Sequence, residues 1–285
     1  MLTRKIFRAM VFVFLTDSHI VRLISFFRPH RFMIRFYRST FFISRILPKY
    51  PVLKIVNGYG RGLKISLSTK NKQDSSEVYY WLGFHEQNIQ RLFHREIKAG
   101  FIIYDVGANI GFFSLIGCRL AGPKGKVFAF EPLPDNIERI KQNVLLNKMQ
   151  STVFCIGKVV TDRSGRGRLL SFGRNDWVHF CNSDDANSPF ETISLDDFIF
   201  KESYPAPNLI KIDVEGGEDK VLAGAKRVLK EFKPVIIVEL HTLEAAKCVF
   251  DILVNFRYRF EDSKGLKIDS ILNQNHILAR PIKMI

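Results

Sequence analysis

The stretch "YDVGANIGFFS", from Tyr104 to Ser114, decides how this chain folds. It extends the apolar run "FII" and is typical of a buried strand that ends in a glycine turn and passes into a helix. Gly107 and Gly111 can adopt backbone conformations that are closed to other residues, and they let a ligand approach the backbone closely. The first turn of the following helix offers free N–H groups. The stretch therefore predicts a ligand site at the end of a strand.

Strands and helices alternate on both sides of this stretch. The patterns predict strands in "KVFAFEP", "TVFCIGKVV", "NLIKIDVEG" and "KPVIIVELH", and two short strands around "KIDS" and "HILARP". They predict helices in "SSEVYYWLGFHEQNIQRLFHREI", "GFFSLIGCRLAG", "PDNIERIKQNVLLNK" (with Asp135 as N-cap), "EDKVLAGAKRVLKEF" and "LEAAKCVFDILVNF". Hairpins are expected in "PVLKIVNGYGRGLKISLS" and around "TDRSGRGRLLSFG". Such alternation predicts an α/β fold with a parallel sheet that is covered on both faces.

The composition supports a folded enzyme-sized domain with a basic extension. The 285 residues are 46% hydrophobic and include 26 phenylalanines, which is enough for a packed core. The net charge of +15 is uneven, because residues 1–50 hold ten Lys/Arg and a single acid. The four cysteines lie far apart without a C-x-x-C pair, so neither a zinc site nor a disulfide framework is expected. We expect a cytoplasmic protein with an extension over 1–50 and one domain over 51–285.

The N-terminal segment has two interpretations. Its apolar run Met10–Leu15 is far shorter than the roughly 20 residues that span a bilayer, and no small-residue cleavage site follows it. Residues 24–46 interleave aromatic and basic residues, which is typical of a helix on an anionic membrane surface. The same pattern fits a helical cap packed on the main domain. No nucleic-acid-binding module is present, so that partner is not expected.

The glycine turn also indicates which ligand it holds. In a parallel α/β sheet, ligands bind beyond the carboxyl ends of the strands where the strand order reverses. Asn109 stands where a dinucleotide-binding turn has its second glycine, and Asp105 would repel a phosphate but attract an ammonium group. Glu131 follows the next strand and can accept both hydroxyls of a ribose. S-adenosylmethionine therefore fits better than NAD(P), although an NAD(P)-dependent oxidoreductase and a non-catalytic protein of this fold stay open as alternatives.

The motifs, taken together, resemble those of a known family. "DVGANIGFFS", "FAFEPLPDN", "ISLDDF", "IKIDVEGGEDKVLAGA", "PVIIVELH" and "HILARP" occur in the order typical of FkbM-type methyltransferases, over about residues 75–280. The resemblance implies a Rossmann-like methyltransferase fold with a mostly parallel seven-stranded sheet. It also implies S-adenosylmethionine as donor and, as acceptor, a hydroxyl of a sugar, glycolipid or secondary metabolite, so a small-molecule or glycan partner.

The resemblance assigns the donor-binding residues position by position. The residues expected to contact the donor are Asp105, Gly107, Ala108, Asn109 and Gly111 at its methionine and adenosine ends, Glu131 at the ribose, Pro132 and Leu133 on the adenine side, and Asp162 near the adenine amine. The first fifty residues lie outside the resemblance.

Three residues are candidates for the catalytic step. Methyl transfer to a hydroxyl needs alignment of the reacting atoms and a group that accepts the hydroxyl proton. Asp213 and Glu215 follow a strand two residues apart, so they would point the same way, and close carboxylates raise one pKa. His241 follows the next strand, and an imidazole titrates near neutral pH. In the alternative, Asp213 orients the donor, Glu215 caps a helix and His241 is structural, so the identity of the base stays open.

No obligatory metal is expected from the sequence. Asp213 and Glu215 alone offer too few oxygen ligands for a divalent cation. Lys211 and Glu239 lie inside apolar strand runs and are interpreted as structural partners.

Overall fold

The computed structural model describes residues 52–67, 77–171, 178–183, 185 and 188–282. The chain divides into two compact units. Of the described residues, the larger unit comprises those in Asn88–Val144 and from Met149 onward, and the smaller unit comprises those up to Gln87 together with Leu145–Lys148. The predicted basic extension and its boundary near residue 50 lie outside the described residues. Among the helices that are described, none has the length and apolar character that crossing a membrane requires.

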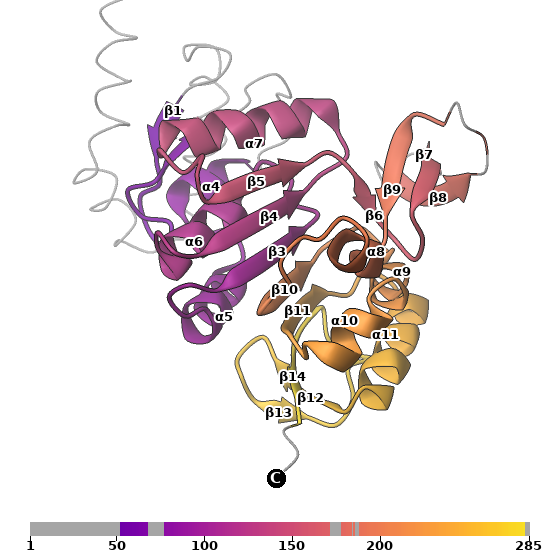
Figure 1. Ribbon diagram of the computed structural model, residues 1–285. Helices are drawn as coiled ribbons and strands as arrows, with labels where there is room; N and C mark the ends of the chain where they lie inside the picture. Colours follow the sequence, from indigo (N-terminus) through magenta and orange to yellow (C-terminus); the bar gives the residue numbers. More distant parts are fainter. Residues whose placement is uncertain (1–51, 68–76, 172–177, 184, 186–187, 283–285) are drawn as a thin grey trace, which may run out of the picture. The chain divides into compact units, whose positions relative to one another are not determined.

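An eight-stranded sheet forms the centre of the larger unit (Figure 1), in the order β13-β12-β14-β11-β10-β3-β4-β5. The strands are β3 (Ile102–Val106), β4 (Lys126–Phe130), β5 (Val153–Ile156), β10 (Leu209–Ile212), β11 (Val235–Glu239), β12 (Tyr258–Asp262), β13 (Lys267–Ile268) and β14 (His276–Pro281). The five strands from β5 to β11 are parallel, and β14 runs antiparallel between β11 and β12. This is the predicted Rossmann-like sheet.

The strand count differs slightly from the prediction of seven strands. β13, the short strand predicted around "KIDS", comprises two residues at the sheet edge. β12 is a strand that the sequence did not predict. The order of the parallel strands runs one way from β3 to β5 and the other way from β10 to β11, so it reverses between β3 and β10. Ligands of open α/β sheets bind at such a switch point.

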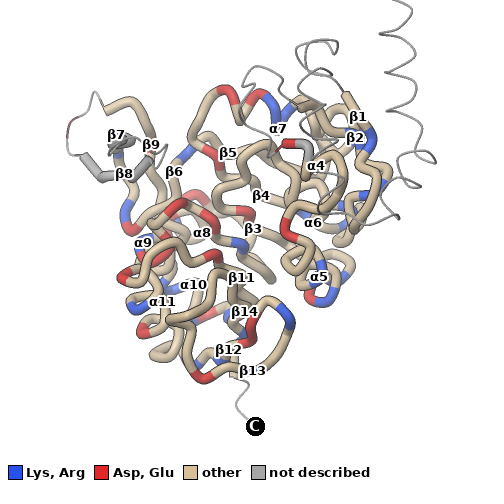
Figure 2. The backbone as a smooth tube through the Cα atoms, turned by 180° about the vertical axis from the view of Figure 1, so that it is seen from behind, with Lys and Arg blue, Asp and Glu red and all other residues tan. Residues whose placement is uncertain are grey.

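Helices cover both faces of this sheet (Figure 1). They are α5 (Gln87–Glu96), α6 (Phe112–Ala121), α7 (Pro134–Leu146), α8 (Leu195–Phe200), α9 (Glu218–Ala223), α10 (Lys226–Glu231) and α11 (Leu243–Asn255). On the face toward α8, the rings of Tyr104, Phe128 and Phe130 pack edge-on around Phe198, with centroids 5.0–5.7 Å from its own. The strands β3, β4 and β11 carry few charges (Figure 2), as expected for strands that are buried on both faces.

Two helix ends test the capping predictions. α6 ends at Gly122 as expected, and this glycine has a φ of 70° and donates its N–H to the carbonyl of Cys118. The prediction of Asp135 as the N-cap of α7 was wrong, because the helix already begins at Pro134. Proline is favoured at the first helical position, where its missing N–H costs nothing. Asp135 therefore lies inside the first turn, where a carboxylate still interacts well with the helix dipole.

A second, four-stranded sheet belongs to the larger unit, in the order β6-β9-β7-β8. Its strands are β6 (Val159–Val160), β7 (Gly165–Ser171), β8 (Val178–Ser183) and β9 (Phe190–Ile193). β7 and β8 form the hairpin that the sequence predicts. The predicted strand "TVFCIGKVV" is in fact two strands in different sheets, because the chain leaves the main sheet after Ile156.

The smaller unit contains the predicted hairpin of β1 (Val52–Lys54) and β2 (Lys64–Ser66), which pair antiparallel. It also contains α4 (Glu77–Leu82), whose Trp81 carbonyl accepts the N–H of Val56 at 2.9 Å. The single helical region predicted here is interrupted after α4 by Gly83, which has a φ of 74°.

The predicted helix "EDKVLAGAKRVLKEF" is likewise two helices, α9 and α10, separated at Gly224. A Cβ on Gly224 would lie 2.2 Å from the carbonyl oxygen of Thr161, which is backbone and cannot move aside cheaply. Close packing against the end of β6, rather than a local preference, accounts for a glycine at this position.

We predict that Gly224→Ala destabilises the protein by about 1–3 kcal/mol through this clash. Gly224 has a φ of −83°, which alanine adopts freely, so the substitution isolates packing from backbone strain. Gly217→Ala is the matched control, because the nearest heavy atom to its Cβ would be 3.6 Å away and its φ is −109°. Urea unfolding compares the two variants with wild type. Equal stability of the two variants would contradict the packing explanation.

Candidate active site

The loop between β3 and α6 is built from left-handed backbone positions. Gly107, Asn109 and Gly111 have φ values of 80°, 51° and 82°. Two glycines allow this without strain, and asparagine is among the residues that tolerate it best. The N–H groups of Gly107 and Ala108 donate to the carbonyl of Phe130 at 3.1 and 3.0 Å. The loop is therefore fastened to the end of β4, next to Glu131.

Gly107 also contacts the end of β10. A Cβ on Gly107 would lie 1.7 Å from the carbonyl oxygen of Asp213, a separation that no side chain permits. The N–H of Asp213 in turn donates to the carbonyl of Val106 at 3.0 Å. The sequence predicted a close approach of a ligand to this glycine, and the structure shows a close approach of the chain's own backbone. The strand ends that flank the switch point are thus held together.

Glu131 lies beside this loop with its carboxylate turned toward the backbone. Its Oε2 accepts the N–H of Asn109 at 2.9 Å, and its Oε1 accepts the N–H of Leu133 at 3.0 Å. Burial raises the pKa of Glu131 despite these hydrogen bonds, which favour the ionised form. The side chain of Asn136 also hydrogen-bonds this carboxylate. An ionised carboxylate has about four acceptor positions, so about one stays available for a further donor. Pro132 is half-buried, and Leu133 is 41% exposed.

Asp105 lies beneath the loop rather than on its surface. Its side chain is fully buried, and Oδ2 accepts the hydroxyl of Ser114 at 2.5 Å. Its direct register partner on β10 is Lys211. A carboxylate at this depth influences a ligand through its charge and through the loop above it.

Asp162 was predicted to contact the donor, but it does not lie in or directly after a strand of the main sheet as the other predicted contacts do. It follows β6, which belongs to the four-stranded sheet, and its side chain is exposed. The hydroxyl of Thr161 donates to its Oδ1 at 3.0 Å. Its place near an adenine amine remains a prediction from the sequence.

The three candidate catalytic residues come together at the ends of β10 and β11. The imidazole Nε2 of His241 lies 3.4 Å from Glu215 Oε2 and 3.9 Å from Asp213 Oδ1. The sequence predicted that Asp213 and Glu215 point the same way because they lie two residues apart in an extended segment. The segment is not extended at Glu215, where a φ of 54° turns the chain, so the extended spacing does not explain why they lie together. Glu215 does not cap the following helix, whose N-cap is Gly217.

The carboxylates around His241 set its charge. Burial lowers the pKa of His241, but the hydrogen bond to Glu218 and the charges of Glu218, Glu215 and Glu239 outweigh it and raise the pKa to about 9. In this arrangement the imidazole is protonated at neutral pH. The sequence predicts only the ordinary value for this histidine, because Glu215 and Glu218 belong to the distant segment after β10.

The two predicted carboxylates differ in their surroundings. Burial disfavours the ionised form of Asp213, but the ammonium of Lys211, 2.8 Å from Oδ2, and the nearby His241 outweigh it and lower the pKa. Burial raises the pKa of Glu215, with a further contribution from neighbouring carboxylates, although its side chain is 60% exposed. A pair of carboxylates whose pKa values are pushed apart is typical of sites with distinct acid–base roles.

Comparison with known proteins shows which family the chain belongs to. The sequence pattern of the Methyltransferase FkbM domain matches residues 105–272, which is more than half of the chain. The match includes the loop after β3, Glu131 and the candidate catalytic residues at the ends of β10 and β11. The chain belongs to the FkbM methyltransferase family. It is therefore a methyltransferase, and the oxidoreductase alternative is excluded.

Individual relatives of this FkbM methyltransferase have named activities. It is 31% identical over 183 residues to the hexuronic acid methyltransferase AglP of Haloferax volcanii, covering 63% of this chain and 72% of AglP. It is 27% identical to the 31-O-demethyl-FK506 methyltransferase FkbM of Streptomyces tacrolimicus, over 53% of this chain and 69% of that protein. It is 25% identical to the 2-O-methyltransferase NoeI of Sinorhizobium fredii, over 76% of this chain and 96% of NoeI.

Among solved structures, the methyltransferase FkbM of Methylobacillus flagellatus is 17% identical, with a TM-score of 0.46. The match covers 71% of this chain and about half (54%) of that one.

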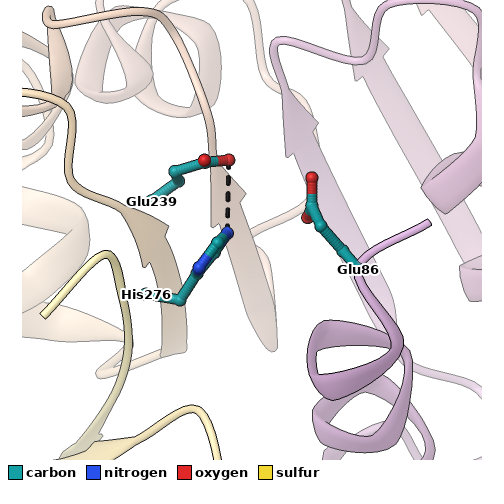
Figure 3. A group of neighbouring side chains, drawn as sticks. All are labelled: Glu86, Glu239 and His276. Carbon is teal, nitrogen blue, oxygen red and sulfur yellow. Dashed lines mark ion pairs between the residues drawn. The ribbon is translucent and has the colours of Figure 1, made fainter. Parts of the chain in front are cut away.

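Three charged residues of this FkbM methyltransferase were not predicted to act at the site. Glu218 Oε1 lies 2.7 Å from His241 Nδ1, and Lys211 neutralises part of Asp213. Glu239 Oε1 lies 3.8 Å from His241 Nε2, and its Oε2 lies 3.3 Å from His276 Nε2 on the neighbouring strand β14 (Figure 3). For Lys211 and Glu239, a charged residue inside an apolar strand was the sequence feature that could have indicated a place in the site. Nothing in the sequence distinguishes Glu218 from an ordinary acidic residue in the first turn of a helix.

We predict that Glu131→Ala destabilises this methyltransferase by about 1–3 kcal/mol, because the N–H groups of Asn109 and Leu133 lose their acceptor. Glu138→Ala, an exposed position on α7, is the control and should change stability by less than about 0.5 kcal/mol. Urea unfolding measures both variants. An unchanged midpoint for Glu131→Ala would show that this carboxylate does not hold the loop.

Proposed function

We propose that this FkbM methyltransferase transfers a methyl group from S-adenosylmethionine to a hydroxyl group of a sugar or a sugar-containing metabolite. Membership of the family supports the methyl transfer. The names of AglP and NoeI, a hexuronic acid methyltransferase and a 2-O-methyltransferase, support a sugar hydroxyl as the acceptor.

The observation that carries the proposal is the position of Glu131. It supplies a nearly buried carboxylate at the end of β4, beside the glycine loop, which accepts hydrogen bonds from Asn109, Leu133 and Asn136 and has about one acceptor position left for a ribose hydroxyl. The exposed side chain of Leu133 offers an apolar surface for the adenine. The buried charge of Asp105 beneath the loop favours a cationic ligand over a diphosphate. The residues present therefore fit an S-adenosyl compound, which supplies a methyl group already activated on a sulfonium.

The reaction assigns a task to each residue at the ends of β10 and β11. The acceptor oxygen forms a bond to the methyl carbon, the carbon–sulfur bond breaks with its electron pair on sulfur, and the hydroxyl proton is released. Glu215 is the group that we assign to accept this proton, because it is exposed toward solvent and has a raised pKa. Asp213, held ionised by Lys211, and the protonated His241 fix the position of Glu215 and the local charge.

Transfer of isotopically labelled methyl groups tests the proposed function. The purified chain, incubated with methyl-labelled S-adenosylmethionine and fractionated glycans, should yield label in a base-stable methyl ether of a sugar. Glu131→Gln should abolish the transfer and weaken donor binding in calorimetric titration, whereas Glu138→Gln should do neither. Absence of both donor binding and transfer in the wild-type chain would favour the non-catalytic alternative.

We predict that Glu215→Gln lowers kcat by roughly 10²–10⁴-fold with little change in donor affinity, because a positioned base contributes about that factor. Glu244→Gln is a suitable control, since Glu244 is an exposed acid in the first turn of α11. Steady-state kinetics with the labelled donor give the comparison. A wild-type kcat in Glu215→Gln would move the role of base to another group.

A further inference from the structure

Three side chains that could bind a metal ion lie close together at the ends of β10 and β11. Asp213, Glu239 and His241 each offer one ligand atom, and the three atoms lie within 4.8 Å of one another. His241 Nε2 lies 3.9 Å from Asp213 Oδ1 and 3.8 Å from Glu239 Oε1. Two ligands on opposite sides of a small divalent cation lie roughly 4.2 Å apart, so these separations suit an ion held between them.

Glu218 provides an independent observation on the opposite edge of the imidazole. Its carboxylate is fully buried, and Oε1 lies 2.7 Å from His241 Nδ1 and accepts the N–H of Gly216 at 2.9 Å. Its Oε2 is buried and has no hydrogen-bond partner among the described residues. A metal-ligating histidine typically donates its other ring N–H to a carboxylate, which fixes the ring and its tautomer. Glu218 orients His241 in this way, with Nε2 directed at Asp213 and Glu239.

Carboxylates also outnumber the basic groups around His241, which include His276 beside Glu239. Four carboxylates (Asp213, Glu215, Glu218 and Glu239) surround His241, and Lys211 pairs with one oxygen of Asp213. The side chains of Asp213 and Glu239 are only 22% and 24% exposed, so water screens this negative charge incompletely. A proton on His241 compensates part of it, and a divalent cation in its place compensates more.

We propose that Asp213, Glu239 and His241 bind a divalent cation, with Glu218 as the residue that positions His241. One nitrogen and carboxylate oxygens form a donor set that suits Mn²⁺ and similar ions of intermediate hardness. This departs from the expectation of no metal, which rested on Asp213 and Glu215 alone. The catalytic meaning of the ion rests on the proposed function: a cation at the ends of β10 and β11 lowers the pKa of the acceptor hydroxyl. The binding itself does not depend on it.

Electron paramagnetic resonance tests the site without the methyl donor. The full chain, treated with a chelator and dialysed, is titrated with MnCl₂ while the six-line signal of free Mn²⁺ is recorded. One ion per chain should bind. Asp213→Asn and Glu239→Gln should each weaken binding by at least about tenfold, and Glu218→Gln by roughly 10–100-fold, while Glu244→Gln leaves it unchanged. Thermal unfolding confirms that each variant is folded.

Absence of Mn²⁺ binding to the wild-type chain overturns the proposal without reference to any variant. So does equal binding by wild type and the folded Asp213→Asn and Glu239→Gln variants, which would place the ion elsewhere. Failure of Mn²⁺ binding together with weaker S-adenosylmethionine binding in Glu239→Gln would assign the cluster to the cationic donor instead. If Mn²⁺ binds as proposed but the wild-type chain neither binds the donor nor transfers methyl groups, the cation site stands and the proposed function fails.

Discussion

The contact between Gly107 and the carbonyl oxygen of Asp213 is the constraint on which the site depends. It joins the ends of β3 and β10, the two parallel strands between which the strand order reverses. Since the space there admits no side chain, only glycine permits the loop after β3 to lie against the loop after β10. The loop that carries Asn109 and contacts Glu131 is thereby held beside the loop that carries Asp213 and Glu215. Backbone packing alone therefore brings these two loops together.

Electrostatics inside the sheet complement this packing. Asp105 and Lys211 are register partners on neighbouring strands, and both side chains are almost entirely buried. Lys211 reaches Asp213 with its ammonium group, which also lies 5.0 Å from the centre of the Phe113 ring. Burying such charges is costly unless they are paired, so their presence in apolar strands indicates a role in the charge of the site. The consequence is an Asp213 that stays ionised next to a His241 with a raised pKa.

The sequence predicted the parts of this arrangement that depend on local pattern. Continuous apolar runs identified β3, β4, β10 and β11, and the glycines identified the loop after β3. What the sequence did not show depends on contacts between distant segments. Gly224 separates α9 from α10 because it packs on Thr161, and Glu218 reaches His241 across 23 positions of the chain.

Other differences have local causes that were misread. β12 was missed because charged residues interrupt the apolar positions of "YRFED", although this alternation is that of a half-buried strand. Asp135 was assigned as a cap because Pro134 was not taken as the first residue of α7. In the site, the pKa of His241 was taken at its ordinary value because Asp213, Glu215 and Glu218 approach it from the segment after β10, which is distant in the sequence. The catalytic roles and the donor contacts stay predictions.

The central claim is that an S-adenosyl nucleoside binds at the strand ends, beside the Gly107–Gly111 loop and Glu131. A crystal structure of the chain grown with S-adenosylhomocysteine tests it most directly. We expect the ribose to hydrogen-bond the Glu131 carboxylate, the adenine to lie against Leu133 and the sulfur to face the ends of β10 and β11. A nucleoside bound elsewhere, or a ribose without contact to Glu131, would contradict it.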